Sequence, residues 1–177
     1  MICDVYHGFL MGVEMKCRKC KGQMTITADD YRYLESGLEN VVLKGIDIFR
    51  CDCGERIVSV PRVPELNALI GENLIRKDSP LAGNEIRFLR KNMGFTGKRL
   101  SEIMGVDNAT ISRWERDFQQ PAKAHDHFIR LLYITEKRVS ADQAKQIVES
   151  VFPGIKPGTK DITDMILNPA AWTTHPA

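Results

Sequence analysis

The sequence predicts an α+β protein in which a small, β-rich N-terminal domain is followed by an all-α domain. Two closely spaced cysteine pairs lie early in the chain, and short runs that alternate apolar with polar residues lie around them. From residue 65 onward, apolar residues recur instead at helical spacing. The chain has 177 residues, 43% of them hydrophobic, which is enough for one ordinary core or two small ones.

The cysteine pairs have the spacing of metal ligands. Cys17 and Cys20 form a C-x-x-C, and Cys51 and Cys53 form a C-x-C after an intervening stretch of residues 21–50. Four thiols in two tight turns predict one structural Zn²⁺ with tetrahedral geometry, and they leave Cys3 as a free thiol. A disulfide pair, a redox dithiol and inert buried cysteines are the alternatives, and the C-x-C has the more strained turn.

Short β-type runs fill the region between Met24 and Val60, namely MTIT, VVL, IDIF and RIVSV. They predict a small antiparallel sheet around the metal. We therefore assign residues 1–14 to an N-terminal extension, residues 15–62 to a zinc-binding β domain, and residues 63–80 to a connecting helix and linker. The helix follows from apolar residues on one face after the boundary at Pro61 and Pro64, namely Leu66, Leu69, Ile70 and Leu74.

Residues 95–115 predict two short helices joined by a tight turn, within a helical domain of residues 81–152 that begins near Asn84. Gly105 ends the first helix, and Asp107 caps the second. The residues predicted to pack inward are Leu100, Ile103 and Met104 on the first helix and Ile111, Trp114 and Phe118 on the second.

The opposite stripe of the second helix carries small and cationic side chains, namely Ala109, Ser112, Arg113 and Arg116. A helix of this kind fits the major groove of DNA, whereas a plain structural hairpin has no need of a cationic stripe. The net charge of the chain is only +2, so any affinity for DNA must come from local placement. Residues 81–116 hold seven cationic and four acidic side chains, an excess of three positive charges near this helix.

The cysteine pairs, followed by VPRVPELNALIGENLIRK and LAGNEIRFLRKNMGFTGKRLSEIMGVDNATISRWER, resemble the YgiT-type zinc-finger/helix-turn-helix family and its MqsA-like antitoxins. The resemblance covers roughly residues 15–135, and its helix-turn-helix part is similar to Xre/Cro-type repressors. It implies a zinc domain that binds a cognate toxin, a homodimer formed through the helix-turn-helix domain, and repression of the protein's own operon at a palindromic operator. The chain departs from the family pattern at Lys21, at the contracted C-x-C, and at Gly97, where a phosphate-binding Gln is frequent.

Within this hypothesis we expect Asn108 and Arg113 to read bases, with Ala109 close to a thymine methyl group. Thr110 and Ser112 would reach bases or phosphates. We expect the DNA backbone to be held by Lys98, Arg99 and Arg116.

A further helix is expected over residues 123–136, where His125 and His127 do not share a face and are expected to be solvent-exposed or near phosphates. Ser140 could cap another helix over residues 141–152. Residues 153–177 hold four of the eight prolines and are assigned to a C-terminal tail, whose apolar residues could dock on a neighbouring surface. They are Ile162, Met165, Ile166 and Trp172.

The sequence thus predicts a DNA-binding transcriptional repressor of the antitoxin type. A toxin-neutralising interaction module and a solitary Xre-type regulator are the alternatives. An enzyme is not expected, because the chain lacks a glycine-rich phosphate loop and a nucleophile elbow, and four cysteine ligands leave no open metal position. No apolar run approaches the roughly 18 residues that cross a bilayer, so we expect a cytoplasmic protein without a membrane partner.

Overall fold

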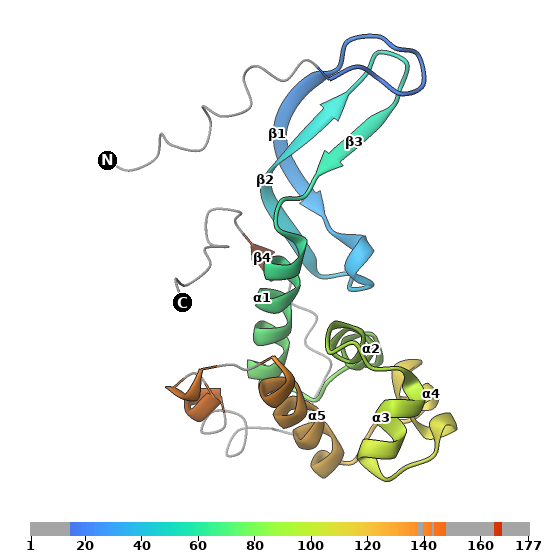
Figure 1. Ribbon diagram of the computed structural model, residues 1–177. Coiled ribbons are helices and arrows are strands. Elements are labelled where there is room, and N and C mark those ends of the chain that lie inside the picture. Colours follow the sequence, from blue (N-terminus) through green and yellow to red (C-terminus); the bar gives the residue numbers. More distant parts are fainter. Residues whose placement is uncertain (1–14, 138–139, 143, 148–164, 168–177) are drawn as a thin grey trace.

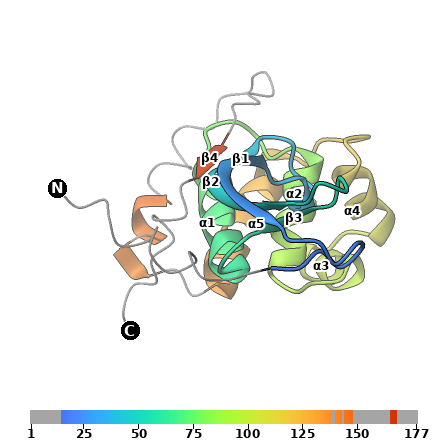
Figure 2. The same ribbon diagram turned by 90° about the horizontal axis from the view of Figure 1, so that it is seen from above.

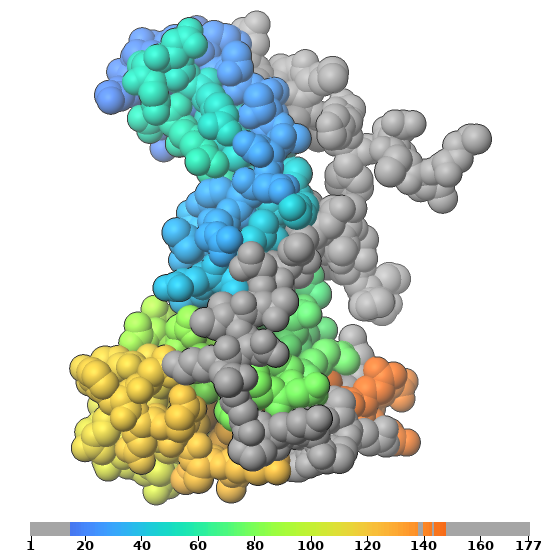
Figure 3. All heavy atoms as spheres, turned by 180° about the vertical axis from the view of Figure 1, so that it is seen from behind, coloured from blue at the N-terminus to red at the C-terminus, as the bar shows by residue number. Residues whose placement is uncertain are grey.

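The computed structural model places a β-sheet at one end of the molecule and a group of helices at the other (Figure 1). It describes residues 15–137, 140–142, 144–147 and 165–167. Seen from above in Figure 2, the sheet stands over the helices rather than beside them, and the space-filling view in Figure 3 shows the resulting elongated outline. None of the helices in these ranges has the length and apolar character needed to cross a bilayer.

The sheet is built on a long central strand. Strand β2 (Val41–Arg50) pairs antiparallel with β1 (Thr25–Arg32) along one edge and with β3 (Arg56–Ser59) along the upper part of the other edge. A short 3₁₀ turn, η1 (Leu34–Ser36), links β1 to β2 at the end that faces the helices. The α+β class and the antiparallel sheet agree with the sequence-based prediction.

A fourth strand lies within the segment that the sequence analysis assigned to a tail. Strand β4 (Met165–Leu167) pairs parallel with β2, in the register Val41 to Met165 and Leu43 to Leu167. It occupies the part of the β2 edge that β3 leaves open. The expected docking of Met165 and Ile166 on a neighbouring surface is thus met by β2 of the same chain. The sequence did not predict a strand here, because backbone pairing with a distant strand leaves no periodic signal in so short a run. Ile162 and Trp172 lie outside the described residues.

Helix α1 (Val63–Arg76) joins the sheet to the helical part through a continuous core. Leu66, Ile70 and Leu74 are buried on one face of this helix, in the same apolar cluster as Val41 and Leu43 of β2. That cluster continues into the helical part and includes residues from α2 (Gly83–Asn92), α3 (Gly97–Met104), α4 (Asn108–Glu115) and α5 (Lys123–Glu136). The buried apolar core therefore runs without interruption from the sheet to the helices.

The packing of α1 against α5 depends on a glycine. A Cβ atom at Gly71 would lie 2.0 Å from the hydroxyl of Tyr133, so only glycine allows the two helices to approach as they do. The hydroxyl in turn accepts a hydrogen bond of 3.0 Å from Asn92 of α2, which also donates to the carbonyl of Asn67 at 2.7 Å. Three helices therefore meet at one buried phenol.

The two helices predicted from residues 95–115 are α3 and α4. Gly105 has φ of 66° and ends α3 in the left-handed conformation, and the Asp107 side chain accepts the Thr110 N–H at 2.7 Å to cap α4. Trp114 is buried, as expected. Phe118 is not part of the packing stripe, because α4 ends at Glu115 and the ring is 74% exposed.

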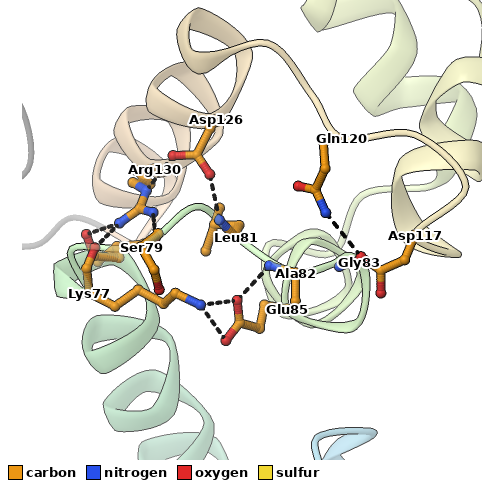
Figure 4. A network of polar contacts seen from close by, with 11 residues as sticks. Lys77, Ser79, Leu81, Ala82, Gly83, Glu85, Asp117, Gln120, Asp126 and Arg130 are labelled. Carbon is orange, nitrogen blue, oxygen red and sulfur yellow. Dashed lines mark hydrogen bonds and ion pairs between the residues drawn. The ribbon is translucent and has the colours of Figure 1, made fainter. Parts of the chain in front are cut away.

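A buried guanidinium joins α5 to the end of α1 (Figure 4). Arg130 is 1% exposed and pairs with Asp126 at 2.8 Å, one turn earlier on the same helix. It also donates to the carbonyls of Ile75, Lys77 and Ser79 at 3.2, 2.7 and 2.8 Å. Carbonyl groups at a helix end have no partner inside the helix, and here one side chain satisfies them.

Carboxylates from three places hold the backbone where α2 begins (Figure 4). Consecutive N–H groups are each accepted by a different side chain: Leu81 donates to Asp126 at 2.7 Å, Ala82 to Glu85 at 2.7 Å, and Gly83 to Asp117 at 2.9 Å. Lys77 pairs with Glu85 at 2.7 Å. The residue that caps α2 is an alanine, which has no side-chain acceptor. Glu85 in the first turn of α2 and the distant Asp126 and Asp117 therefore bind the backbone at this helix start instead.

The helix expected over residues 141–152 is present as far as the described residues extend. Residues 141–142 and 144–147 are helical, and the N–H of Ala144 donates to the carbonyl of Ser140 at 2.8 Å. Ile147 is buried in the main core. Residues 148–152 lie outside the described part of the chain.

We predict that Gly83→Ala lowers the free energy of unfolding by roughly 1–3 kcal/mol, the usual cost of forcing extra atoms into a packed site. An added Cβ would lie 2.4 Å from the Trp114 carbonyl oxygen and 2.9 Å from the Asp117 nitrogen, and backbone atoms cannot move aside. Chemical denaturation measures the effect.

Gly97→Ala is the matched control, because it also changes the first residue of a helix. There the nearest atom to an added Cβ is Oδ1 of Asn108, at 2.9 Å on a mobile side chain. We expect a change within about 0.5 kcal/mol. Equal losses for both variants would show that the contact between α2 and α4 is not tight.

Candidate metal centre and nucleic-acid interface

The first cysteine pair lies in a tight turn that precedes β1. The N–H of Cys17 donates to the carbonyl of Gly22, and the N–H of Lys21 donates back to the carbonyl of Cys17, both at 2.9 Å. Lys21 has φ of 63°, in the left-handed region that few residues other than glycine adopt. The turn folds the Cys20 thiol back so that the Gly22 N–H lies 3.4 Å from its sulfur.

The second pair lies in the turn between β2 and β3. The N–H of Cys51 donates to the carbonyl of Glu55, and the N–H of Gly54 donates to the carbonyl of Cys51, both at 2.9 Å. Gly54 has φ of 88°, which permits the turn despite a single spacer residue. Both turns lie at the end of the sheet farthest from the helices (Figure 1).

All four thiols come together at one point. The sulfur atoms of Cys17, Cys20, Cys51 and Cys53 lie within 4.8 Å of one another, with separations of 3.6 Å for Cys17 to Cys53 and 3.4 Å for Cys20 to Cys51. A disulfide needs about 2.05 Å. Zinc–sulfur bonds of about 2.3 Å in a tetrahedron place sulfurs about 3.8 Å apart. The donor set and its spacing therefore fit a tetrahedral Zn²⁺.

The four thiols influence one another's ionisation, because their sulfurs lie so close together. The backbone N–H of Cys20 lowers the pKa of Cys17 to about 7. The N–H of Cys53 also favours a thiolate at Cys51, but the neighbouring thiol of Cys20 and desolvation outweigh it and raise the pKa of Cys51 to about 12. Without a cation, one thiolate opposes ionisation of its neighbours, whereas four thiolates become stable together when a divalent metal lies between them.

An ion pair between α2 and α4 stabilises the helix-turn-helix. Arg90 of α2 donates to both carboxylate oxygens of Glu115, one of them at 3.0 Å, and to the carbonyl of Phe95 at 2.7 Å. This pair, which the sequence analysis did not identify, joins α2 to the end of α4. The Glu115 carboxylate raises the pKa of Arg90 further, so the guanidinium stays charged. Helix α4 is therefore held by its inner face and its C-terminal end.

The outer face of α4 is open to solvent. Asn108, Ala109, Arg113 and Arg116 are exposed, whereas Thr110 and Ser112 are half-buried. The N–H of Thr110 lowers the pKa of Asp107, so the helix cap stays ionised. The structure thus brings the expected DNA-reading residues onto one accessible surface.

Two of the three expected phosphate contacts, Lys98 and Arg99, lie where the N-termini of α3 and α4 are close together, whereas Arg116 lies at the other end of α4. Lys98 and Arg99 are exposed in the first turn of α3, where Arg99 is 3.7 Å from Glu102. The Asn108 side chain lies over Gly97, which leaves room for it because it has no Cβ. Exposed backbone N–H groups and cations at such helix starts favour bound anions.

The two histidines of α5 are half-buried, so they are less exposed than the first of the two expected placements. The second, a position near a phosphate, stays a prediction. The ring of His125 lies 5.1 Å from that of Trp114, between centroids, and packs α5 against α4. Burial lowers the pKa of His127. Their spacing in the sequence could not reveal an aromatic neighbour from another helix.

Residues 86–124, from within α2 to the start of α5, match the helix-turn-helix family. No curated protein matches the chain. The match covers the Arg90–Glu115 pair, both short helices and the outer face of α4. The chain therefore contains an Xre-type helix-turn-helix domain, which supports binding to double-stranded DNA.

We predict about one zinc ion per chain in protein purified without added metal or chelator. Cys17→Ser should abolish it, whereas Cys3→Ser should not, because four ligands already fill the site. Because thiols must lose their protons to bind, zinc affinity should fall as the pH falls, measured by competition with a chromophoric chelator. If the purified protein contains no zinc and its sheet is nevertheless intact, the prediction is wrong and the cysteines have no structural role.

Proposed function

We propose that the protein is a sequence-specific transcriptional repressor that binds a palindromic operator as a homodimer. The observation that carries this proposal is the combination of an exposed, cationic outer face of α4 with an inner face fixed by the core and by the Arg90–Glu115 pair. A rigid helix that presents such a face can enter the major groove. Because its target is chromosomal DNA, we place the protein in the cytoplasm.

We assign base recognition to Arg113 and Asn108, and close approach to Ala109. An exposed Arg can donate two hydrogen bonds to guanine, and Asn can pair with adenine in the same way. Arg113 lies 3.5 Å from the hydroxyl of Thr110, which supports its orientation along the outer face. Lys98, Arg99 and Arg116 flank these residues and are suited to backbone phosphates.

We propose that α5 supplies the dimer contact. Phe128 is 41% exposed, and Leu132, one turn further on, is half-buried. The two side chains lie on one face of the helix, so a second copy could cover both at once. A symmetric dimer would present its two α4 helices to successive major grooves about 34 Å apart.

We propose a structural role for zinc and no catalytic role for the chain, because four thiol ligands leave no open coordination position. Zinc would hold together the two turns at the outer end of the sheet, where Cys17 packs with Met24 and Phe49 in a second, small apolar cluster. This cluster is separate from the main core. The metal would therefore stabilise the one part of the sheet that α1 does not support.

A second candidate function is binding of a protein partner, such as a cognate toxin, at the cysteine end. Its support is a group of four exposed cations that have no ion pair within the described residues: Lys16, Arg18, Lys19 and Lys21. They lie far from α4, so this end could bind a partner while the helix-turn-helix binds DNA (Figure 1). An antitoxin would bind both a toxin and DNA, whereas a solitary regulator would bind only DNA.

A gel shift with the DNA upstream of the protein's own gene tests the main proposal. Arg113→Ala should lower operator affinity by roughly 1–3 kcal/mol and relax the preference at one base pair. Arg99→Ala is the matched comparison: it should weaken binding to all sequences about equally and reduce the salt slope by about one. Uniform weakening by Arg113→Ala would make it a phosphate contact instead.

Phe128→Glu should convert the dimer to a monomer, measured by sedimentation velocity, because a buried charge at the contact costs more than the contact provides. Leu34→Glu is the control, since Leu34 is 58% exposed on the η1 turn, away from α5. A Phe128→Glu protein that remains dimeric would place the interface on another surface.

A further inference from the structure

An exposed aromatic ring lies immediately beyond the DNA-facing helix. Phe118 is 74% exposed, more than any other large apolar side chain in the described part of the protein. The match to the helix-turn-helix family does not explain such a ring, and neither does the core. The ring contacts a cation: the guanidinium carbon of Arg116 lies 5.4 Å from the centre of the ring.

The backbone fixes the place of this ring. Helix α4 ends at Glu115, and Asp117 reverses the chain with φ of 58°. The N–H of Phe118 donates to the carbonyl of Arg113 at 2.9 Å, and the Asp117 carboxylate accepts the N–H of Gly83 at 2.9 Å. The turn is therefore tied both to α4 and to the start of α2.

Arg116 is held on its other side by Ser112, one turn earlier. Its Nε donates to the Ser112 carbonyl at 3.1 Å, and its Nη2 donates to the Ser112 hydroxyl oxygen at 2.6 Å. Within the described residues, Nη1 has no acceptor and the guanidinium has no carboxylate partner. Serine and phenylalanine thus fix the orientation of a guanidinium whose charge and remaining donors are available.

We propose that Ser112 and Phe118 are positioning residues that hold Arg116 ready to bind one backbone phosphate at the C-terminal end of α4. This inference rests on the proposed DNA-binding function. A free Arg loses side-chain entropy when it binds, and an Arg already ordered by a ring and a hydroxyl loses less. Ser112 then acts through Arg116, not as a reader of bases.

The test uses the full-length, zinc-loaded protein and its operator, with affinity measured at several salt concentrations. Arg116→Ala should weaken binding to all sequences and lower the salt slope by about one. Phe118→Leu should weaken binding about 2- to 5-fold, the range expected for loss of an exposed cation–π contact, with the slope retained because the phosphate contact persists. Phe118→Tyr should restore wild-type affinity, and Ser112→Ala should resemble Phe118→Leu.

A double-mutant cycle separates positioning from direct contact. In the Arg116→Ala background, Phe118→Leu should have no further effect, because it has no guanidinium left to hold. An equal loss in both backgrounds overturns the inference, since Phe118 would then contact DNA itself or support the fold. If Phe118→Leu and Ser112→Ala both leave the affinity unchanged while the wild type binds the operator, the positioning role is overturned but the proposed DNA-binding function is not. Failure of the wild type to bind DNA overturns the proposed function as well.

Discussion

The buried guanidinium of Arg130 determines how the two halves of the protein are joined. It binds three carbonyls where α1 ends, while its partner Asp126 fixes the N–H of Leu81 just before α2 begins. Burying an ion pair contributes little net stability, but removing one partner leaves an uncompensated charge and several unsatisfied polar groups. The pair therefore acts mainly to select one path for the chain, and through that path it sets where α2, and hence α4, lies relative to the sheet.

Local signals in the sequence predicted most of the helices well. The expected helix over residues 123–136 has the observed bounds of α5. Gly105 and Asp107 correctly marked the end of α3 and the start of α4, since both residues act on their own neighbours. The cysteine spacing likewise identified four residues that the fold brings together. The zinc ion itself, the dimer and the toxin partner stay predictions.

Contacts between residues far apart in the chain could not be predicted from the sequence. Phe118 has the sequence spacing of the inner face of α4. However, the helix ends at Glu115 and Asp117 adopts a left-handed conformation, so the Phe118 ring is exposed instead of packed. Asp117 itself looks like an ordinary loop residue, although it caps a helix that begins 34 residues earlier. No local propensity encodes such a partner. The same holds for Arg90 and Glu115, which are unremarkable until α2 and α4 are packed together.

The parallel pairing of β4 with β2 gives the chain an unusual order of assembly. In topological terms, the whole helix-turn-helix is an insertion between two strands of one sheet. During synthesis, the helical part leaves the ribosome before Met165–Leu167 can reach the edge of β2 at Val41–Leu43. Such a long-range pairing adds to contact order, so the β2–β4 edge should close after the local pairing of β1, β2 and β3. Tension applied to the C-terminus would reach the sheet directly, without passing through the DNA-binding helices.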